Sequence, residues 1–334
     1  MLAAAIFIAA PTLLQGPTEP HWTDWWTENL RWSIDESVRV LTDGKGKSTA
    51  TLAFFGLDIH KVISTDERDV ATLNLQPFLT RVDSLDPHPP LFDGSEDWEL
   101  VWRIFNANVK LRDDGSMNLR VGHFEVPFGL EHLVVTNGTL RDYTHPANFG
   151  LKADWGATLN GELESFEYEV AWSRGSGNEW DSEGDPGVFS GRFGTPRDSD
   201  QVFGVSFVEG DFQTPAGILE RSRVGLDATV YRKNLGFMAE VSSGENGGDT
   251  DVLKALGEVN WRNSNETQFS WVQLVSSSLD GPSGETTTLE SKLGMRWTVA
   301  TGWNISVQYT QILDPAMPGG SHDGGFALQL RVRF

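Results

Sequence analysis

Basic side chains recur at alternate positions of several segments whose intervening positions are apolar. In residues 223–233, Arg223 and Lys233 occupy polar positions, and Val224 and Leu226 occupy apolar positions between them. A row of cations along a polar conduit lowers the electrostatic barrier for anions. We expect nine basic residues placed in this way to line a polar interior: Lys110, Arg112, Arg120, Arg223, Lys233, Lys254, Arg262, Lys292 and Arg296.

The segments that carry these residues have the two-residue period of β-strands. Side chains of a strand point alternately to opposite faces, so each segment has one apolar and one polar face. The same pattern occurs in residues 165–174, 252–262 and 288–299. Clusters of Gly, Asn, Asp, Ser and Pro, which form turns, separate the segments, and no convincing helical period follows residue 32. The sequence therefore predicts an all-β protein.

The composition excludes several classes of function. The chain has 26 Lys and Arg residues against 47 Asp and Glu, a net charge of −21, which disfavours nucleic acid as a partner. It has no cysteine, which excludes a disulfide framework, a thiolate zinc site and a cysteine nucleophile. Beyond the N-terminus, no stretch approaches the roughly 18 apolar residues that a membrane-spanning helix needs.

The C-terminal strand favours one of two arrangements of amphipathic strands. A soluble sandwich buries its apolar faces against each other, whereas a membrane barrel turns them to lipid and keeps polar groups inside. The chain ends in Phe326-Ala-Leu-Gln-Leu-Arg-Val-Arg-Phe334, with an apolar side chain at every second position up to the final Phe. Outer-membrane barrels typically end in this way, and their assembly machinery reads this strand. We therefore expect a transmembrane antiparallel β-barrel in a bacterial outer membrane, with three partners: the lipid bilayer, lipopolysaccharide and the assembly machinery.

The links between the predicted strands alternate in length. Counting back from Phe334, the long links are 314–325, 277–286, 243–251, 209–222, 175–187, 128–154 and 83–97. Bacterial barrels have long external loops and short periplasmic turns, so the C-terminus is expected at the periplasmic end. The count predicts 16 strands if residues 32–42 form the first strand, with 14 as the alternative. The barrel is then predicted over residues 32–334.

The longest link, 128–154, is the third external loop in this count. It contains more apolar residues than a solvated loop should, including Leu130, Val134 and Phe149. Either the loop folds into the barrel and narrows it, or it packs against a neighbouring subunit. For the first case, the expected constriction residues are Glu131, His132, Arg141, Asp142 and Tyr143.

Motifs in residues 119–177 point to a family. A Gly-x-Phe-x-x-Pro-Phe-Gly-x-Glu pattern runs from Gly122 to Glu131, and an Asp-x-Gly-x-x-x-x-Gly pattern runs from Asp154 to Gly161. An aromatic-rich strand that ends in a Gly-rich loop follows. These motifs, on less than a fifth of the chain, resemble the phosphate-selective porin O and P family of outer-membrane porins. The resemblance implies a usually trimeric, 16-stranded porin for passive diffusion of small hydrophilic solutes or ions, without establishing phosphate as the solute.

The charges predict little selectivity or a mild anion preference. Acidic residues concentrate in the links and would make an acidic outer mouth, whereas the strand positions facing the lumen are richer in bases. Many of these bases fall near periplasmic strand ends, where they would instead be rim charges outside the narrowest point.

Two other functions remain open. One is a structural barrel that anchors a partner and has a plugged lumen, and the other is an outer-membrane barrel enzyme. The chain has no His-Glu-x-x-His, Gly-x-Ser-x-Gly or Gly-x-x-x-x-Gly-Lys run, and its histidines are scattered. We predict no catalytic residue, no metal site and no cofactor.

The N-terminal region divides into two expected parts. Residues 1–16 are apolar and fit either the remnant of a secretion signal or an ordinary apolar tail, because no Lys or Arg precedes Arg31. Residues 17–31 are rich in Trp, which favours membrane interfaces. This segment is expected to form a short interfacial or lumen-plugging helix, or a tail that packs on a neighbouring subunit.

Overall fold

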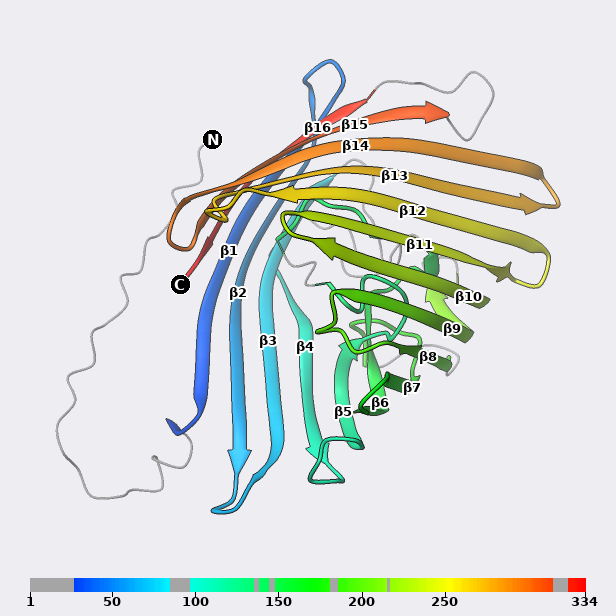
Figure 1. The fold of residues 1–334 in the computed structure, drawn as a ribbon. Coiled ribbons are helices and arrows are strands. Elements are labelled where there is room, and N and C mark those ends of the chain that lie inside the picture. Colours follow the sequence, from blue (N-terminus) through cyan, green and yellow to red (C-terminus); the bar gives the residue numbers. More distant parts are fainter. Residues whose placement is uncertain are drawn as a thin grey trace.

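The strands of this protein close into a single antiparallel barrel (Figure 1). The computed structural model describes residues 27–84, 97–134, 138–143, 148–180, 186–214, 217–314 and 324–334. Each strand pairs with its neighbours in sequence, and β1 pairs with β16 to close the barrel. The predicted all-β transmembrane barrel and the count of 16 strands are confirmed, including the first strand. Among the described residues, no helix has the length and hydropathy to cross a membrane.

The strands differ in length around the barrel. Their bounds are β1 (Leu30–Asp43), β2 (Ser48–Ser64), β3 (Asp69–Ser84), β4 (Glu99–Lys110), β5 (Asn118–Glu125), β6 (Ala153–Glu162), β7 (Glu167–Ser173), β8 (Val188–Gly194), β9 (Gln201–Thr214), β10 (Gly217–Arg232), β11 (Leu235–Asn246), β12 (Thr250–Arg262), β13 (Gln268–Gly281), β14 (Gly284–Ala300), β15 (Trp303–Asp314) and β16 (Gly325–Arg333).

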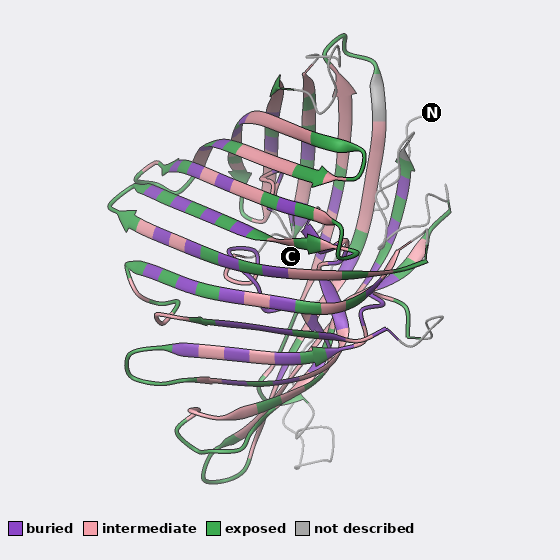
Figure 2. Ribbon diagram, turned by 90° about the vertical axis from the view of Figure 1, so that its right-hand side faces the viewer, coloured by how far each residue is buried: buried purple, intermediate pink, exposed green. Residues whose placement is uncertain are grey.

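Polar side chains face the barrel interior, and apolar side chains face outwards. In β11, Met238, Glu240 and Ser242 are buried, whereas Phe237 and Val241, at the alternate positions, are exposed. Figure 2 shows buried and exposed residues alternating along many strands. A closed barrel pairs its strand edges, so an apolar exterior can face lipid without unpaired backbone groups.

The two ends of the barrel differ. The C-terminal rim holds Phe334, whose backbone exchanges hydrogen bonds with Ile34 of β1, and carries short connections such as 163–166 and 233–234. The opposite rim, called the loop rim here, carries the connections 126–152 and 174–187.

Three links predicted to be long are instead mostly strand. The predicted loops 209–222, 243–251 and 277–286 are the ends of β9–β14, and pairing continues to Gly281 opposite Gly284 in the last of them. Their Gly, Ser and Thr residues are turn formers locally, but cross-strand pairing holds them in extended conformation.

The N-terminal predictions fall mainly on residues that the structure does not describe. The expected signal remnant 1–16 and residues 17–26 of the Trp-rich segment lie outside the described residues. At the end of that segment, Asn29 has a positive φ of 53°, and β1 begins at Leu30, two residues before the predicted start of the barrel.

Candidate channel interior

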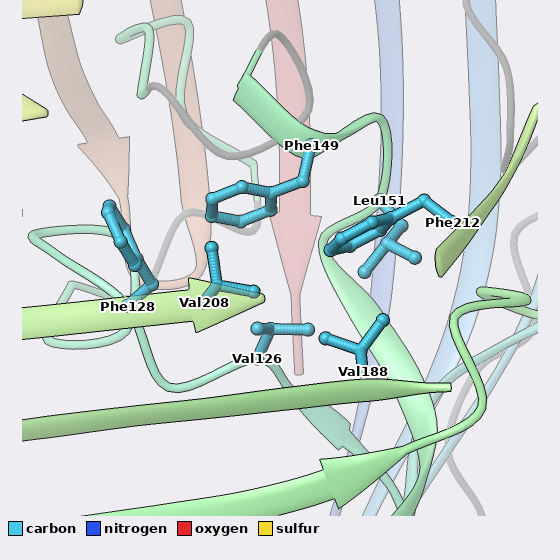
Figure 3. Close-up of a cluster of buried hydrophobic side chains, with 7 residues drawn as sticks. All are labelled: Val126, Phe128, Phe149, Leu151, Val188, Val208 and Phe212. Atoms are coloured by element: carbon cyan, nitrogen blue, oxygen red, sulfur yellow. The ribbon is translucent and has the colours of Figure 1, made fainter. Parts of the chain in front are cut away.

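The described residues of the connection between β5 and β6 lie inside the barrel, and apolar side chains anchor the two ends of this connection. Figure 3 shows Val126, Phe128, Phe149 and Leu151 of this connection packed with side chains of β8 and β9. The partners from the wall are Val188, Val208 and Phe212, and every member of the cluster is at most 1% exposed. Full burial of each large apolar side chain stabilises by roughly 1.5–3 kcal/mol. We call the described residues of this connection, 126–134, 138–143 and 148–152, the inner segment.

Backbone hydrogen bonds hold the start of the inner segment against the wall. The Gly129 amide donates to Ser206 Oγ at 3.0 Å, and the Leu130 amide donates to Glu240 Oε2 at 2.7 Å. Gly129 has a φ of 57°, and a Cβ at this position would lie 2.2 Å from Glu240 Oε2. Only glycine allows both the backbone conformation and this approach.

A second apolar cluster and several polar contacts fix the middle of the segment. Leu130 and Tyr143 pack against Met238 and Leu256 of β11 and β12. Burial raises the pKa of Tyr143 well above its ordinary value, and the nearby Arg141 opposes this shift to a smaller extent. The phenol is therefore neutral at physiological pH.

Charged groups extend these contacts across the interior. Arg141 Nη1 donates to Glu258 Oε1 of β12 at 2.8 Å, and Lys292 of β14 pairs with Asp142. On the other side of the barrel, Arg39 Nη2 of β1 donates to the Thr139 carbonyl at 2.9 Å. The inner segment thus contacts the wall from β7 round to β14 and also reaches β1.

The predicted constriction residues all belong to contacts of this segment. Glu131 pairs with Lys152 at 3.2 Å, and His132 Nε2 lies 3.4 Å from Glu169 Oε2 of β7. Arg141 and Asp142 bind β12, β13 and β14, while Tyr143 is in the apolar cluster.

The nine predicted interior bases divide into two groups. Those that occupy inward positions along the wall are Arg120, Arg223, Lys254, Lys292 and Arg296. Those that lie exposed at the C-terminal rim are Lys110, Arg112, Lys233 and Arg262. The second group has the rim location that the sequence left open as an alternative.

The inward carboxylates of the wall are largely neutralised by nearby bases. Arg192 forms ion pairs with Glu167 and Asp227 at 3.2 and 2.7 Å, and Arg120 pairs with Glu169 at 2.7 Å. Lys254 and Arg296, in contrast, form no hydrogen bond or ion pair within the described residues. The N–H donors of these two inward bases are therefore available to solutes.

Sequence reasoning missed several inward bases, including Arg39, Arg103 and Arg192. The alternation around them was readable, because Phe189 and Phe193 flank Arg192 on the outward face. Around Arg103 the alternation of polar and apolar residues is irregular. Gln76 of β3 pairs with Ile104 and Pro77 pairs with Trp102, so the register shifts at Arg103.

The remaining interior is polar and accessible. Several inward side chains are only half-buried, as in Asn74 and Gln76 of β3 and Thr310 of β15. The described residues contain no cluster of three or more His, Cys, Asp or Glu side chains able to hold a metal. The arrangement can therefore guide solutes by polarity and charge.

The fold of this chain is similar to solved structures of other proteins. No family model matches the chain, and no curated relative matches it. Among solved structures, OprB of Pseudomonas putida has 11% identity and a TM-score of 0.67, over 93% of this chain and 96% of OprB.

Two other solved structures align over most of the chain. An anion-selective porin from Comamonas acidovorans has 10% identity and a TM-score of 0.63, over 91% of this chain and 99% of that porin. OmpT, an outer membrane protein of Vibrio cholerae, in a trimer form, has 9% identity and a TM-score of 0.62, over 91% and 99% of the two chains. At these identities the likeness concerns the fold: the chain has the fold of outer-membrane porins. The predicted location in a bacterial outer membrane agrees with this fold.

Proposed function

We propose that this chain is an outer-membrane porin through which small hydrophilic solutes and ions diffuse passively. The observation that carries the proposal is a closed barrel with a polar, partly accessible interior that one folded-in segment, 126–152, narrows. In this role the inner segment is the constriction, and the inward bases line the pore. Long loops face the exterior and the C-terminal rim faces the periplasm.

A mild anion preference is part of the proposal. Lys254 and Arg296 face inwards without a carboxylate partner, whereas the carboxylates of Glu258, Glu169 and Asp227 are engaged in ion pairs. The uncompensated charge along the pore then favours anions, although the whole chain has a net charge of −21.

Membership of the phosphate-selective porin O and P family, assembly into homotrimers and contact with lipopolysaccharide complete the proposal. The family motif supports the first point, since Phe124 and Phe128 are buried and Gly129 makes the close approach to Glu240. The trimer rests on the recorded trimer form of the structurally similar OmpT.

Single-channel recording in planar bilayers tests the proposal. We expect ohmic open channels and a reversal potential of anion-selective sign across a salt gradient. Silent bilayers with correctly folded protein would instead support a structural barrel with a plugged lumen. A strongly cation-selective reversal potential would refute the anion preference alone.

A further inference from the structure

The outer face of the barrel has a groove over β10 and β11, on the side that faces lipid. Ala239 of β11 is the register partner of Ala228 on β10 and of Gly257 on β12, so three small residues lie side by side across the wall. A Cβ on Gly257 would meet no atom within 4 Å, so the space above it is open. Beside this row, Leu226 and Val241 project outwards, and the hollow that they border has a volume of about 870 Å³. We call this hollow the outer groove.

The lining of the outer groove is apolar and extends to the C-terminal rim. The large outward side chains that border it are Phe166, Phe193, Phe203, Val205, Leu226 and Val241. The outward face of an outer-membrane barrel lies against hydrocarbon, so a groove on this face accepts an apolar chain.

A second hollow of about 720 Å³ adjoins the outer groove at the C-terminal rim, and Ser165 and Thr195 line both of them. The charged residues that line the second hollow are all acidic: Asp114, Glu162, Glu164 and Asp198. These side chains are exposed, and none of them forms an ion pair with a described residue. We call this hollow the acidic hollow.

The nearby bases do not neutralise the acidic hollow. Arg197, in the same turn as Asp198, pairs with Glu167 at 3.1 Å instead. Arg112 attracts Asp114 without forming an ion pair with it, and the Asp114 carboxylate accepts a hydrogen bond from the Ser116 amide at 2.9 Å. The end of the apolar groove is therefore complementary to a cation.

We propose that the outer groove and the acidic hollow together bind one phospholipid with an amine headgroup, such as phosphatidylethanolamine, in the leaflet on the C-terminal side. An acyl chain lies over Ala228 and Ala239, and the ammonium group lies among the carboxylates. An ammonium group only donates hydrogen bonds and an ionised carboxylate only accepts them, so the acidic hollow favours an amine over an anionic headgroup. The inference depends on the membrane barrel and not on passage of solutes through the lumen.

Lipid binding to the delipidated, detergent-solubilised full-length protein tests the site. Native mass spectrometry measures the fraction of chains that retain phosphatidylethanolamine or phosphatidylglycerol with the same acyl chains, as each lipid is titrated. We expect one phosphatidylethanolamine per chain to bind about fivefold more tightly than phosphatidylglycerol, because contacts between exposed charges are modest. Ala239→Leu should weaken the binding of both lipids about tenfold, because the larger side chain occupies the groove and removes apolar contact with the acyl chain.

Two further variants separate the headgroup from the acyl chain. The double variant Glu164→Gln with Asp198→Asn should lower the affinity for phosphatidylethanolamine to that for phosphatidylglycerol, whose binding should not fall. Ala157→Leu is the matched control, because it adds the same bulk at an outward position of β6, between Val121 and Trp172. It should leave the affinity for both lipids within about twofold, as is usual for surface substitutions. Heat-modifiable mobility in SDS verifies that each variant is folded.

The outcomes separate this site from other occupants and from the porin function. Equal retention of phosphatidylethanolamine by folded wild type and Ala239→Leu overturns the site, and so does equal binding of the two lipids by the wild type. A changed oligomer mass in Ala239→Leu with unchanged lipid retention shows that a second copy covers the groove, which also overturns the lipid site. Open channels without lipid preference leave the porin function intact, whereas selective lipid binding by a protein without conductance supports the site alone.

Discussion

The region of β5–β8 has short strands and long connections, whereas the region of β9–β14 has long strands and short connections. The four strands of the first region have 8, 10, 7 and 7 residues, and long connections follow β5 and β7. Strands of the second region have 12 to 17 residues, and tight hairpins join them at the loop rim. In the β5–β8 region, more residues belong to connections than to strands, and the connection after β5 contains the inner segment. The contacts of the inner segment fall mainly on the inward face of β9–β14.

The side chains of these connections explain why the one after β5 enters the interior, whereas the described hairpins of β9–β14 extend the wall. The inner segment carries apolar side chains at both ends and glycine where its backbone approaches Glu240. The hairpins of β9–β14 carry polar side chains and continue the sheet pairing instead. Burial of apolar side chains and pairing of backbone groups are the two ways in which a long connection can be stabilised, and each region uses one of them.

The largest expected effect comes from the anchor of the inner segment. Phe149→Ala should lower the free energy of unfolding by about 3–5 kcal/mol and raise the single-channel conductance, because it leaves a cavity in a fully buried cluster. Denaturant titration in lipid vesicles measures the first and bilayer recording the second. Phe203→Ala, on the exposed outer face of β9, is the control and should cost less than half as much. Equal losses in the two variants would contradict an anchored segment.

A smaller effect is expected from the ion pair at the middle of the segment. Glu258→Gln removes the charge partner of the largely buried Arg141 and should cost about 2 kcal/mol. It should also increase current noise as the segment loosens. The control Glu266→Gln breaks a pair whose members are exposed, and should change the free energy of unfolding by less than about 0.5 kcal/mol. If both variants have the same small effect, the ion pair between Arg141 and Glu258 does not stabilise the inner segment.

The pH dependence of stability tests the burial of Tyr143 in the second apolar cluster. Its hydroxyl is buried and has no hydrogen-bond partner among the described residues, so Tyr143→Phe should stabilise by about 1 kcal/mol. Burial raises the pKa of the folded-state phenol, so its contribution to stability is present below the unfolded-state pKa of about 10. That contribution falls as the pH rises above this value, because the unfolded chain loses the proton first. The free energy of unfolding of the wild type should therefore decline more between pH 10 and 11 than that of Tyr143→Phe. Denaturant midpoints at each pH measure this difference. If the two proteins lose stability in parallel over this range, Tyr143 is not buried.

The smallest effect concerns the hairpins and has the opposite sign. Asp280 lies in register beside Asp251 and Glu285 on the outward face at the loop rim. Like charges directly opposite each other destabilise a sheet, so Asp280→Ser should raise the free energy of unfolding by about 0.5 kcal/mol at low salt, with no gain at high salt. Conductance should stay unchanged. A destabilised Asp280→Ser protein would mean that these carboxylates have a stabilising partner.

Much of the wall was predictable because its information is local. Alternation placed the strands, the last strand ending at Phe334 favoured a membrane barrel, and the first strand was found in residues 32–42, close to the observed Leu30–Asp43. The lengths of the hairpins were not predictable in this way. Residues such as Gly281 and Gly284 favour turns, and only their pairing partners show that the strands continue past the predicted ends.

The sequence by itself determined the fold class, the polar interior and the unusual apolar content of residues 128–154, and it limited the strand count to 16 or 14. These properties depend on the order of polar and apolar residues along the chain. Only the tertiary structure decided that Phe128 and Phe149 meet Phe212, that Arg141 reaches Glu258, and that Arg262 and Arg296 share the ring of Phe269. Such contacts join residues far apart in the chain, and they depend on the three-dimensional closure of the barrel, which no local pattern encodes.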